Sequence, residues 1–160
     1  MAQFRNNRCL GNMEIQKVVK ADLDAVISLV SEVSNKDVLP LLNKQGKQEY
    51  QNRVLPDLAT TFDDEKFLSV KAVSGGELLG FAALRDGNYL THLFVSSSQQ
   101  GVGLGRALLN HLLNQTEASE ISLRSSVNAV GFYNHNGFEA TAEEAEFNGI
   151  RFVPMSLVRA

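Results

Sequence analysis

Apolar and polar positions in the first 62 residues predict one strand followed by helices. Residues 14–20 alternate apolar and polar side chains, as a half-buried strand does. In residues 23–33 the apolar positions recur at spacings of three and four, which places them on one side of a helix. Residues 38–62 are apolar around Pro40 and Pro56, and we expect one or two short helices there because proline is tolerated at a helix start.

The middle of the chain predicts three strands in succession and then a helix. Residues 67–73, 78–84 and 89–95 are strand-like and are separated by short turns rich in glycine, aspartate and asparagine. The helix begins near Leu104. Its expected apolar stripe runs through Leu104, Leu108, His111 and Leu112 toward Gln115, and it is flanked by Ala107, Leu109 and Leu113.

The last 40 residues predict a strand, a short helix and a hairpin. Residues 121–125 form the strand and residues 128–135 the helix. Two extended runs, 138–147 and 150–158, are joined by Asn148-Gly149, a strong hairpin signal. The whole order indicates an α/β (α+β) fold with one central, mixed and mostly antiparallel sheet of about seven strands and helices on both faces.

Composition narrows the class of protein. The 160 residues suit one domain, which we assign to residues 14–160 after a leader at 1–13. Fifteen basic and 18 acidic residues give a net charge of −3, which supplies no basic stripe for a nucleic acid. Cys9 is the single cysteine and excludes a disulfide framework. The sequence has no apolar run of membrane-spanning length and no secretory signal, so we expect a cytoplasmic protein without membrane contact.

A glycine-rich loop is the first candidate site. Gly101, Gly103 and Gly105 alternate directly around the start of the helix at Leu104. Glycines let backbone N–H groups approach a ligand, and the positive end of the helix dipole points to the same place, so the loop can bind phosphate. Arg106 adds a cation. The alternative is a loop that only packs the helix closely on the sheet.

Two common phosphate-binding motifs do not fit this loop. A P-loop requires Gly-Lys-Ser or Gly-Lys-Thr, which is missing. A dinucleotide fingerprint requires G-x-G-x-x-G and an acidic residue after the next strand, whereas here that strand ends at Arg124-Ser125-Ser126. A dinucleotide-binding oxidoreductase is therefore disfavoured.

Two motifs resemble the GCN5-related N-acetyltransferase (GNAT) superfamily. The loop Gln100-Gly101-Val102-Gly103-Leu104-Gly105 is similar to the family signature of Gln or Arg followed by spaced glycines. The stretch from Asn128 through Tyr133 to Gly137-Phe138 is similar to a second family block. The resemblance extends over residues 14–158.

The resemblance implies an N-acetyltransferase that uses acetyl-CoA and needs no metal. The backbone from Gly101 to Arg106, including Val102, Leu104 and Gly105, would hold the pyrophosphate, beside Gln100. The pantetheine arm would run along the strand at Leu93, Phe94 and Val95, in a gap between two parallel strands. Asn128 would bind the arm, and Tyr133 would lie near the sulfur.

Two side chains are candidates for catalysis. The Tyr133 hydroxyl can protonate the leaving thiol, or the ring can simply pack its helix on the sheet. His92 can accept the proton of the amine, or it can face the other way and pack. A backbone N–H near Phe94–Val95 is the expected oxyanion donor. His111 and His135 are expected to be structural.

The acceptor stays open between small-molecule and peptide amines. The acidic runs at 63–65 and 139–146 would attract a cationic acceptor or simply be solvated, and residues 39–42 with Tyr50 and Phe62 would line its pocket or belong to the core. We expect direct transfer in a ternary complex, because no residue offers a plausible acyl-carrying nucleophile. The alternative is a non-catalytic CoA-binding sensor or interaction module. The C-terminal hairpin could pair two subunits into a homodimer.

Overall fold

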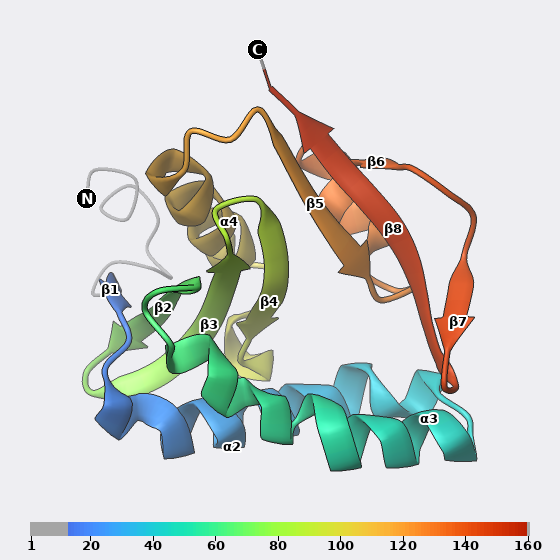
Figure 1. Ribbon diagram of the computed structural model, residues 1–160. Helices are drawn as coiled ribbons and strands as arrows, with labels where there is room; N and C mark the ends of the chain where they lie inside the picture. The colour runs from blue at the N-terminus through green and yellow to red at the C-terminus, as the bar shows by residue number, and fades with distance from the viewer. Residues whose placement is uncertain (1–12, 160) are drawn as a thin grey trace.

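The computed structural model describes residues 13–159 and contains one eight-stranded sheet with helices on both faces (Figure 1). The predicted class is confirmed, with one strand more than expected. Residues 1–12 of the predicted leader, Cys9 among them, lie outside the described residues. Met13 is buried in the core. The strands are β1 (Glu14–Lys17), β2 (Phe67–Ser74), β3 (Glu77–Arg85), β4 (Tyr89–Val95), β5 (Glu120–Ser125), β6 (Glu139–Ala140), β7 (Ala145–Phe147) and β8 (Ile150–Val158).

The strands run in the order β1-β2-β3-β4-β5-β8-β6, and β7 pairs with β8. Neighbours are antiparallel except β4 and β5, which are parallel. The helices are α2 (Leu23–Asp37), α3 (Lys44–Glu49), α4 (Leu104–Gln115) and α5 (Val130–His135). Shorter 3-10 turns are η2 (Lys20–Asp22), η3 (Leu39–Leu41), η5 (Pro56–Phe62) and η6 (Ser97–Gln99), and η4 (Tyr50–Val54) is a π-helix.

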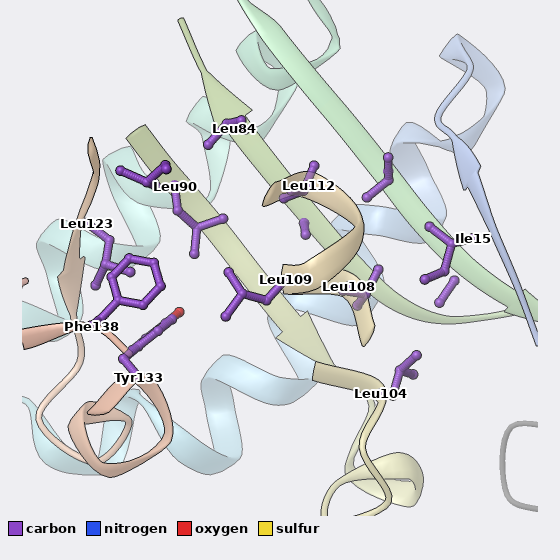
Figure 2. Close-up of a cluster of buried hydrophobic side chains, with 14 of the residues drawn as sticks. Ile15, Leu84, Leu90, Leu104, Leu108, Leu109, Leu112, Leu123, Tyr133 and Phe138 are labelled. Carbon is purple, nitrogen blue, oxygen red and sulfur yellow. The ribbon is translucent and has the colours of Figure 1, made fainter. Parts of the chain in front are cut away.

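The core on the α4 face of the sheet is built from leucines at helical spacing (Figure 2). Leu104, Leu108, Leu109 and Leu112 are fully buried. The prediction put His111 in this face, but His111 is only half-buried and Leu109 takes its place. This side of the sheet also carries Tyr133 and Phe138, which follow β5.

The opposite face is covered by α2. Val26, Val30 and Val33 pack against Phe81 and Ala83 of β3. Because side chains alternate along a strand, Leu93 and Val95 of β4 face α4, whereas His92 and Phe94 face α2. We call these two layers the α4 side and the α2 side.

Residues 38–62 form four short helical segments, η3, α3, η4 and η5, where one or two were predicted, and η5 begins at Pro56 as expected. Asn43 caps α3 by accepting a hydrogen bond from Gly46 N at 2.8 Å. The Tyr50 hydroxyl and Ser34 Oγ are buried and lie 2.7 Å apart, which joins η4 to α2. Gly46 lies so close to Gly149 that a Cβ added to either glycine would overlap the other's backbone. This contact packs α3 directly against the β7–β8 turn.

The C-terminal hairpin is confirmed at its turn and shorter on one side than predicted. Asn148 and Gly149 have φ values of 51° and 86°, as a tight turn between β7 and β8 requires. The predicted run 138–147 is broken into β6 and β7. Both short strands are exposed and pair with β8, so no buried face imposes one continuous strand on these residues.

Candidate active site

The candidate site lies where β4 and β5 separate. Their pairing covers Tyr89 with Ser122 and Leu90 with Leu123, and beyond Leu90 the strands diverge (Figure 1). A cavity of about 1040 Å³, here called the cleft, opens beside them. Residues of β4, the glycine loop, β5 and α5 line one part of the cleft: Thr91–Val95, Gln99, Gln100, Gly101, Gly103, Gly105, Arg106, Arg124, Ser126–Ala129, Phe132 and Tyr133. Residues of the α2 side line the other part, among them Val33, Asp37, Val38, Leu41, Leu42, Glu49, Tyr50, Arg53, Ile150, Arg151 and Phe152.

A β-bulge at Thr91 accompanies the separation. Ala83 lies opposite His92, whereas Leu84 lies opposite Leu90, so Thr91 is an extra residue in β4. Its Oγ1 donates to the Ala83 carbonyl at 3.2 Å. Bulges bend their strand, so this one helps to turn β4 away from β5.

Beyond Leu90 the edge of β4 that faces the gap has no strand paired with it. Ser96 N donates to Leu79 on β3 at 2.8 Å. Since the N–H groups of a strand alternate between its two neighbours, those of Leu93 and Val95 point into the gap. An extended ligand can therefore pair with this edge as an added strand would.

The glycine loop leads into the N-terminus of α4. Gly101 and Gly103 have φ values of 81° and 90°, in the left-handed region that favours glycine. Gly103 is the N-cap, so the first turn of α4 begins without a side chain over its N–H groups. A Cβ on Gly105 would lie 3.4 Å from the Phe132 ring, an ordinary contact distance, so α4 packs closely against α5 at this position.

The predicted loop residues form two groups, those that line the cleft and those whose side chains pack in the core. Gln100, Gly101, Gly103, Gly105 and Arg106 line the cleft. The Leu104 side chain is fully buried in the core, and Val102 packs against the same core, so these two residues can serve a ligand through their backbone.

Asp37 at the end of α2 connects both walls of the cleft. Its carboxylate accepts a hydrogen bond from Gln100 Nε2 at 2.9 Å, and its carbonyl accepts one from Asn128 Nδ2 at 3.1 Å. Gln100 Nε2 also donates to the Val95 carbonyl at 3.1 Å. The two polar side chains singled out by the sequence are thus brought together by a residue that the sequence analysis missed.

Tyr133 lies on the α4 side with its hydroxyl directed toward β4 (Figure 2). Its ring makes edge contacts with Phe132 and Phe138 at centroid distances of 5.2 and 5.7 Å. Burial raises the pKa of the Tyr133 hydroxyl well above its usual range, so the group stays protonated at neutral pH. In residues 13–159 no protein group accepts its hydrogen bond, which leaves the donor available to a molecule in the cleft.

His92 lies on the α2 side and lines the cleft. It packs against Phe81 and Phe94 at centroid distances of 5.9 and 6.2 Å, and its Nδ1 lies 2.8 Å from Thr91 Oγ1. Burial lowers the pKa of the imidazole to about 4, so His92 is neutral at pH 7. The ring packs in the core and also borders the cleft, and its role as a proton acceptor stays a prediction.

Several residues of the α2 side were not predicted from the sequence. Arg53 from η4 and Arg124 from β5 bring charge to the cleft, and Phe152 from β8 brings a ring. Arg124 could have been found by alternation, because Leu123 and Ser125 on either side of it are buried. Of the predicted pocket strip, Leu41, Leu42 and Tyr50 line the cleft, whereas Phe62 stacks on Phe81 in the core.

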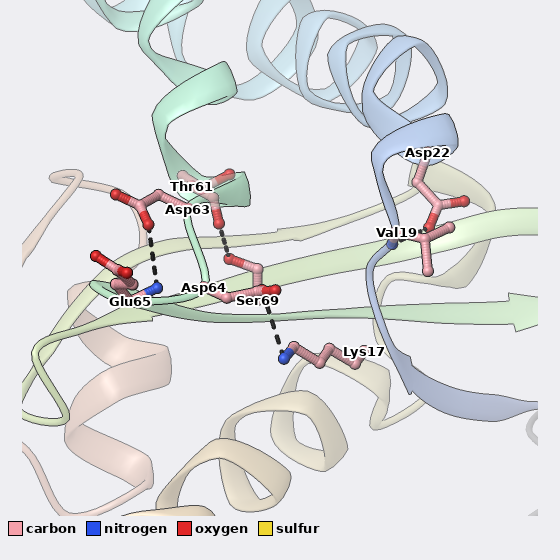
Figure 3. Close-up of polar contacts among 8 residues, drawn as sticks. All are labelled: Lys17, Val19, Asp22, Thr61, Asp63, Asp64, Glu65 and Ser69. Atoms are coloured by element: carbon pink, nitrogen blue, oxygen red, sulfur yellow. Dashed lines mark hydrogen bonds and ion pairs between the residues drawn. The ribbon is translucent and has the colours of Figure 1, made fainter.

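Acidic residues of both predicted runs bond to other groups of the protein (Figure 3 shows residues 63–65). Asp63 Oδ1 accepts from Glu65 N at 3.0 Å, and Asp64 pairs with Lys17 at 3.4 Å, close to where Ser69 Oγ donates to the Thr61 carbonyl. Glu144 forms a bidentate pair with Arg151 at 2.6 and 3.0 Å. The carboxylates that line the cleft are instead those of Asp37, Glu49 and Asp57.

The described residues contain neither a metal-binding cluster nor a membrane-spanning helix. Between Met13 and Arg159 no three His, Cys, Asp or Glu side chains are grouped so that they could hold a metal ion. The same part of the chain contains no helix that is long and apolar enough to cross a bilayer.

Residues 38–159 match the acetyltransferase (GNAT) domain family. The chain belongs to this family. The peptidyl-lysine N-acetyltransferase YjaB of Escherichia coli is 34% identical over 98 residues, which cover 58% of this chain and 63% of YjaB, so the chain spans less than two thirds of that relative.

Solved structures share the fold. A GCN5-related N-acetyltransferase from Rhodopseudomonas palustris superposes with a TM-score of 0.71 at 20% identity, over 91% of this chain and 94% of that one. The PaiA N-acetyltransferase of Thermoplasma acidophilum, in complex with coenzyme A, gives 0.70 at 19% identity, over 91% and 98%. The GNAT fold therefore extends through the β1 and α2 region, N-terminal to the matched family segment.

Proposed function

We propose that the chain is an N-acetyltransferase that moves an acetyl group from acetyl-CoA to a primary amine by direct transfer. One observation carries the proposal. The gap between β4 and β5 joins an N-terminal helix loop with left-handed glycines to a tyrosine whose hydroxyl has no protein acceptor among the described residues. The coenzyme A complex of PaiA, which shares the fold, and the name of YjaB support the same chemistry.

The residues of the cleft fit coenzyme A. The N–H groups from Gly101 to Arg106 at the start of α4 suit a pyrophosphate, because the helix dipole and the orphan amides favour anions there. The Leu93 and Val95 edge of β4 suits the amides of the pantetheine arm. Asn128 suits a further polar group of the arm. Gln100 and Asn128 then exchange their bonds to Asp37 for contacts with the ligand.

Acetyl-CoA, when bound, supplies an acetyl group on a thiol that is a fair leaving group, with a pKa near 8.5. Tyr133 donates a hydrogen bond to the departing sulfur, and because its raised pKa keeps the proton on the oxygen, the hydroxyl stabilises the leaving thiolate as a hydrogen-bond donor. A backbone N–H of Leu93 or Val95 stabilises the charge that develops on the carbonyl oxygen.

The proton of the amine is taken by a weak base. His92 is neutral at pH 7, and its low pKa makes it unable to hold the proton of a free alkylammonium ion. The amine therefore binds in its neutral form. Once it has attacked the carbonyl its nitrogen is far more acidic, and a neutral imidazole is then sufficient as acceptor, directly or through water.

Thiol release tests the function. The full chain is incubated with acetyl-CoA and a panel of amino acids, polyamines and lysine peptides, and free thiol and acetylated product are both measured. Thiol release that depends on the amine, with one acetyl group gained per thiol, supports direct transfer. Tight binding of coenzyme A with no turnover on any amine would leave the non-catalytic CoA-binding module as the correct interpretation.

A further inference from the structure

Arg124 presents a cation to the cleft from the α2 side of the sheet. It lies on β5 between Leu123 and Ser125, which are buried toward α4, so its side chain projects to the opposite face. The guanidinium carbon lies 4.5 Å from the centre of the Phe152 ring, which orients the group by a cation–π contact. His92 of β4 faces the same side of the sheet and lines the same cleft.

Three other charged side chains of the α2 side have partners, whereas Asp57 of η5 lines the cleft without an ion pair among residues 13–159. Arg53 pairs with Glu49 at 3.6 Å, and Arg151 forms its bidentate pair with Glu144. The Asp37 carboxylate accepts from Gln100. Within residues 13–159, the Arg124 guanidinium has no ion pair and no hydrogen bond, although it lines the cleft with Phe152.

We infer that Arg124 binds a carboxylate of the acceptor, so that the acceptor is an amino acid or a similarly small amine with a carboxylate. A guanidinium held by its face against a ring keeps its edge N–H groups free, and these match a carboxylate in a bidentate arrangement. The inference rests on the proposed function, because it assumes that the amine attacks in the gap between β4 and β5.

The position of Arg124 argues against the alternative that it binds a phosphate of coenzyme A. The glycine loop and Arg106 lie at the start of α4, on the other layer of the sheet. Arg124 directly follows Leu123, the last β5 residue that pairs with β4, so its side chain enters the cleft next to the place where the gap opens. An acceptor whose carboxylate lies close to its amine can reach both places, whereas a lysine inside a peptide has no free carboxylate of its own.

The test compares amino acids with their α-carboxamides as acceptors at saturating acetyl-CoA. We expect the wild type to prefer the carboxylates by about 10- to 100-fold in kcat/KM, the value of a charged hydrogen bond. Arg124→Gln should abolish the preference by raising KM for the acid while KM for acetyl-CoA stays unchanged. Phe152→Leu should reduce the preference less. Arg85→Gln is the matched control, because Arg85 also lies over a ring, at 4.7 Å from Tyr89, outside the cleft.

The outcomes separate the inference from the function beneath it. Equal acetylation of acids and amides, or faster acetylation of an amidated lysine peptide, overturns the inference while the proposed function stands. A preference that survives Arg124→Gln, or an effect of this variant on acetyl-CoA instead of the acceptor, also overturns it. No thiol release with any amine would contradict the proposed function itself.

Discussion

The α4 side and the α2 side of the cleft are built in different ways. The α4 side offers backbone groups on a rigid support, since the glycine loop leads into a helix in which four of the five leucines are fully buried. The α2 side offers side chains from α2, η3, η4, β5 and β8, which meet in space but lie far apart in the sequence. A site made of backbone groups depends on the conformation of the chain, so proteins of different sequence can bind the same ligand there. A site made of side chains can come to bind a different ligand when those side chains are substituted.

The loss of a core leucine beneath the α4 side should lower the free energy of unfolding far more than the loss of a leucine on the α2 side. Leu108→Ala leaves a cavity beneath β3, where the Leu108 side chain lies against Gly80, and we expect the free energy of unfolding to fall by about 2–5 kcal/mol. Leu41→Ala, on the exposed rim of the α2 side, should cost about 0.5 kcal/mol. Urea unfolding measures both, and equal losses would contradict the difference in support.

His92 is a titratable side chain of the α2 side that is buried in the core. Its pKa is about 4 in the folded chain and near 6.5 when unfolded, so the unfolded state binds the proton first as the pH falls. Stability from this group is complete above pH 6.5, and about 3 kcal/mol is lost as the pH falls to 4. His92→Leu should remove this loss in unfolding measured across that range. Parallel pH dependences of the wild type and the variant would refute the burial of His92.

Tyr133→Phe tests the catalytic contribution of the α4 side. The ring and its contacts with Phe132 and Phe138 remain, whereas the donor to the sulfur is lost, so we expect kcat to fall by about 10²-fold with coenzyme A affinity unchanged. Tyr89→Phe, outside the cleft, serves as the control. Unchanged turnover in Tyr133→Phe would restrict Tyr133 to packing.

Asp37→Asn should have the smallest effect. It removes a negative charge beside Gln100 and the glycine loop, so the affinity for coenzyme A should rise about two- to five-fold and the gain should shrink at high salt. Asp24→Asn, at the other end of α2, should change nothing. Weaker binding of coenzyme A to Asp37→Asn would show that the carboxylate positions Gln100 for the ligand.

The sequence allowed the prediction of the α4 side because its signals are local. The loop before Leu104, the leucine spacing of α4 and the Asn148-Gly149 turn each depend on neighbouring residues, and the structure confirms these elements. His111 was wrongly placed on the buried face, because the spacing of apolar residues alone cannot decide which of two neighbouring positions on a helix faces the core.

The α2 side could not be predicted in the same way. The π-helix at Tyr50–Val54 and the contact of Gly46 with Gly149 depend on tertiary packing, which no local pattern reveals. Asp37 meets Gln100 and Asn128 from 63 and 91 residues away. β6 and β7 were missed as separate strands because exposed short segments leave no apolar alternation.

The most direct test of the central claim is calorimetric titration of coenzyme A into the wild type, Gly103→Ala and Gly75→Ala. Both glycines have positive φ, 90° and 59°, so both variants carry similar backbone strain, but Gly75 lies in the β2–β3 turn. We predict that coenzyme A binds the wild type and Gly75→Ala alike and binds Gly103→Ala about 10- to 100-fold more weakly. No heat with the wild type, or equal affinity in the two variants, would contradict the account.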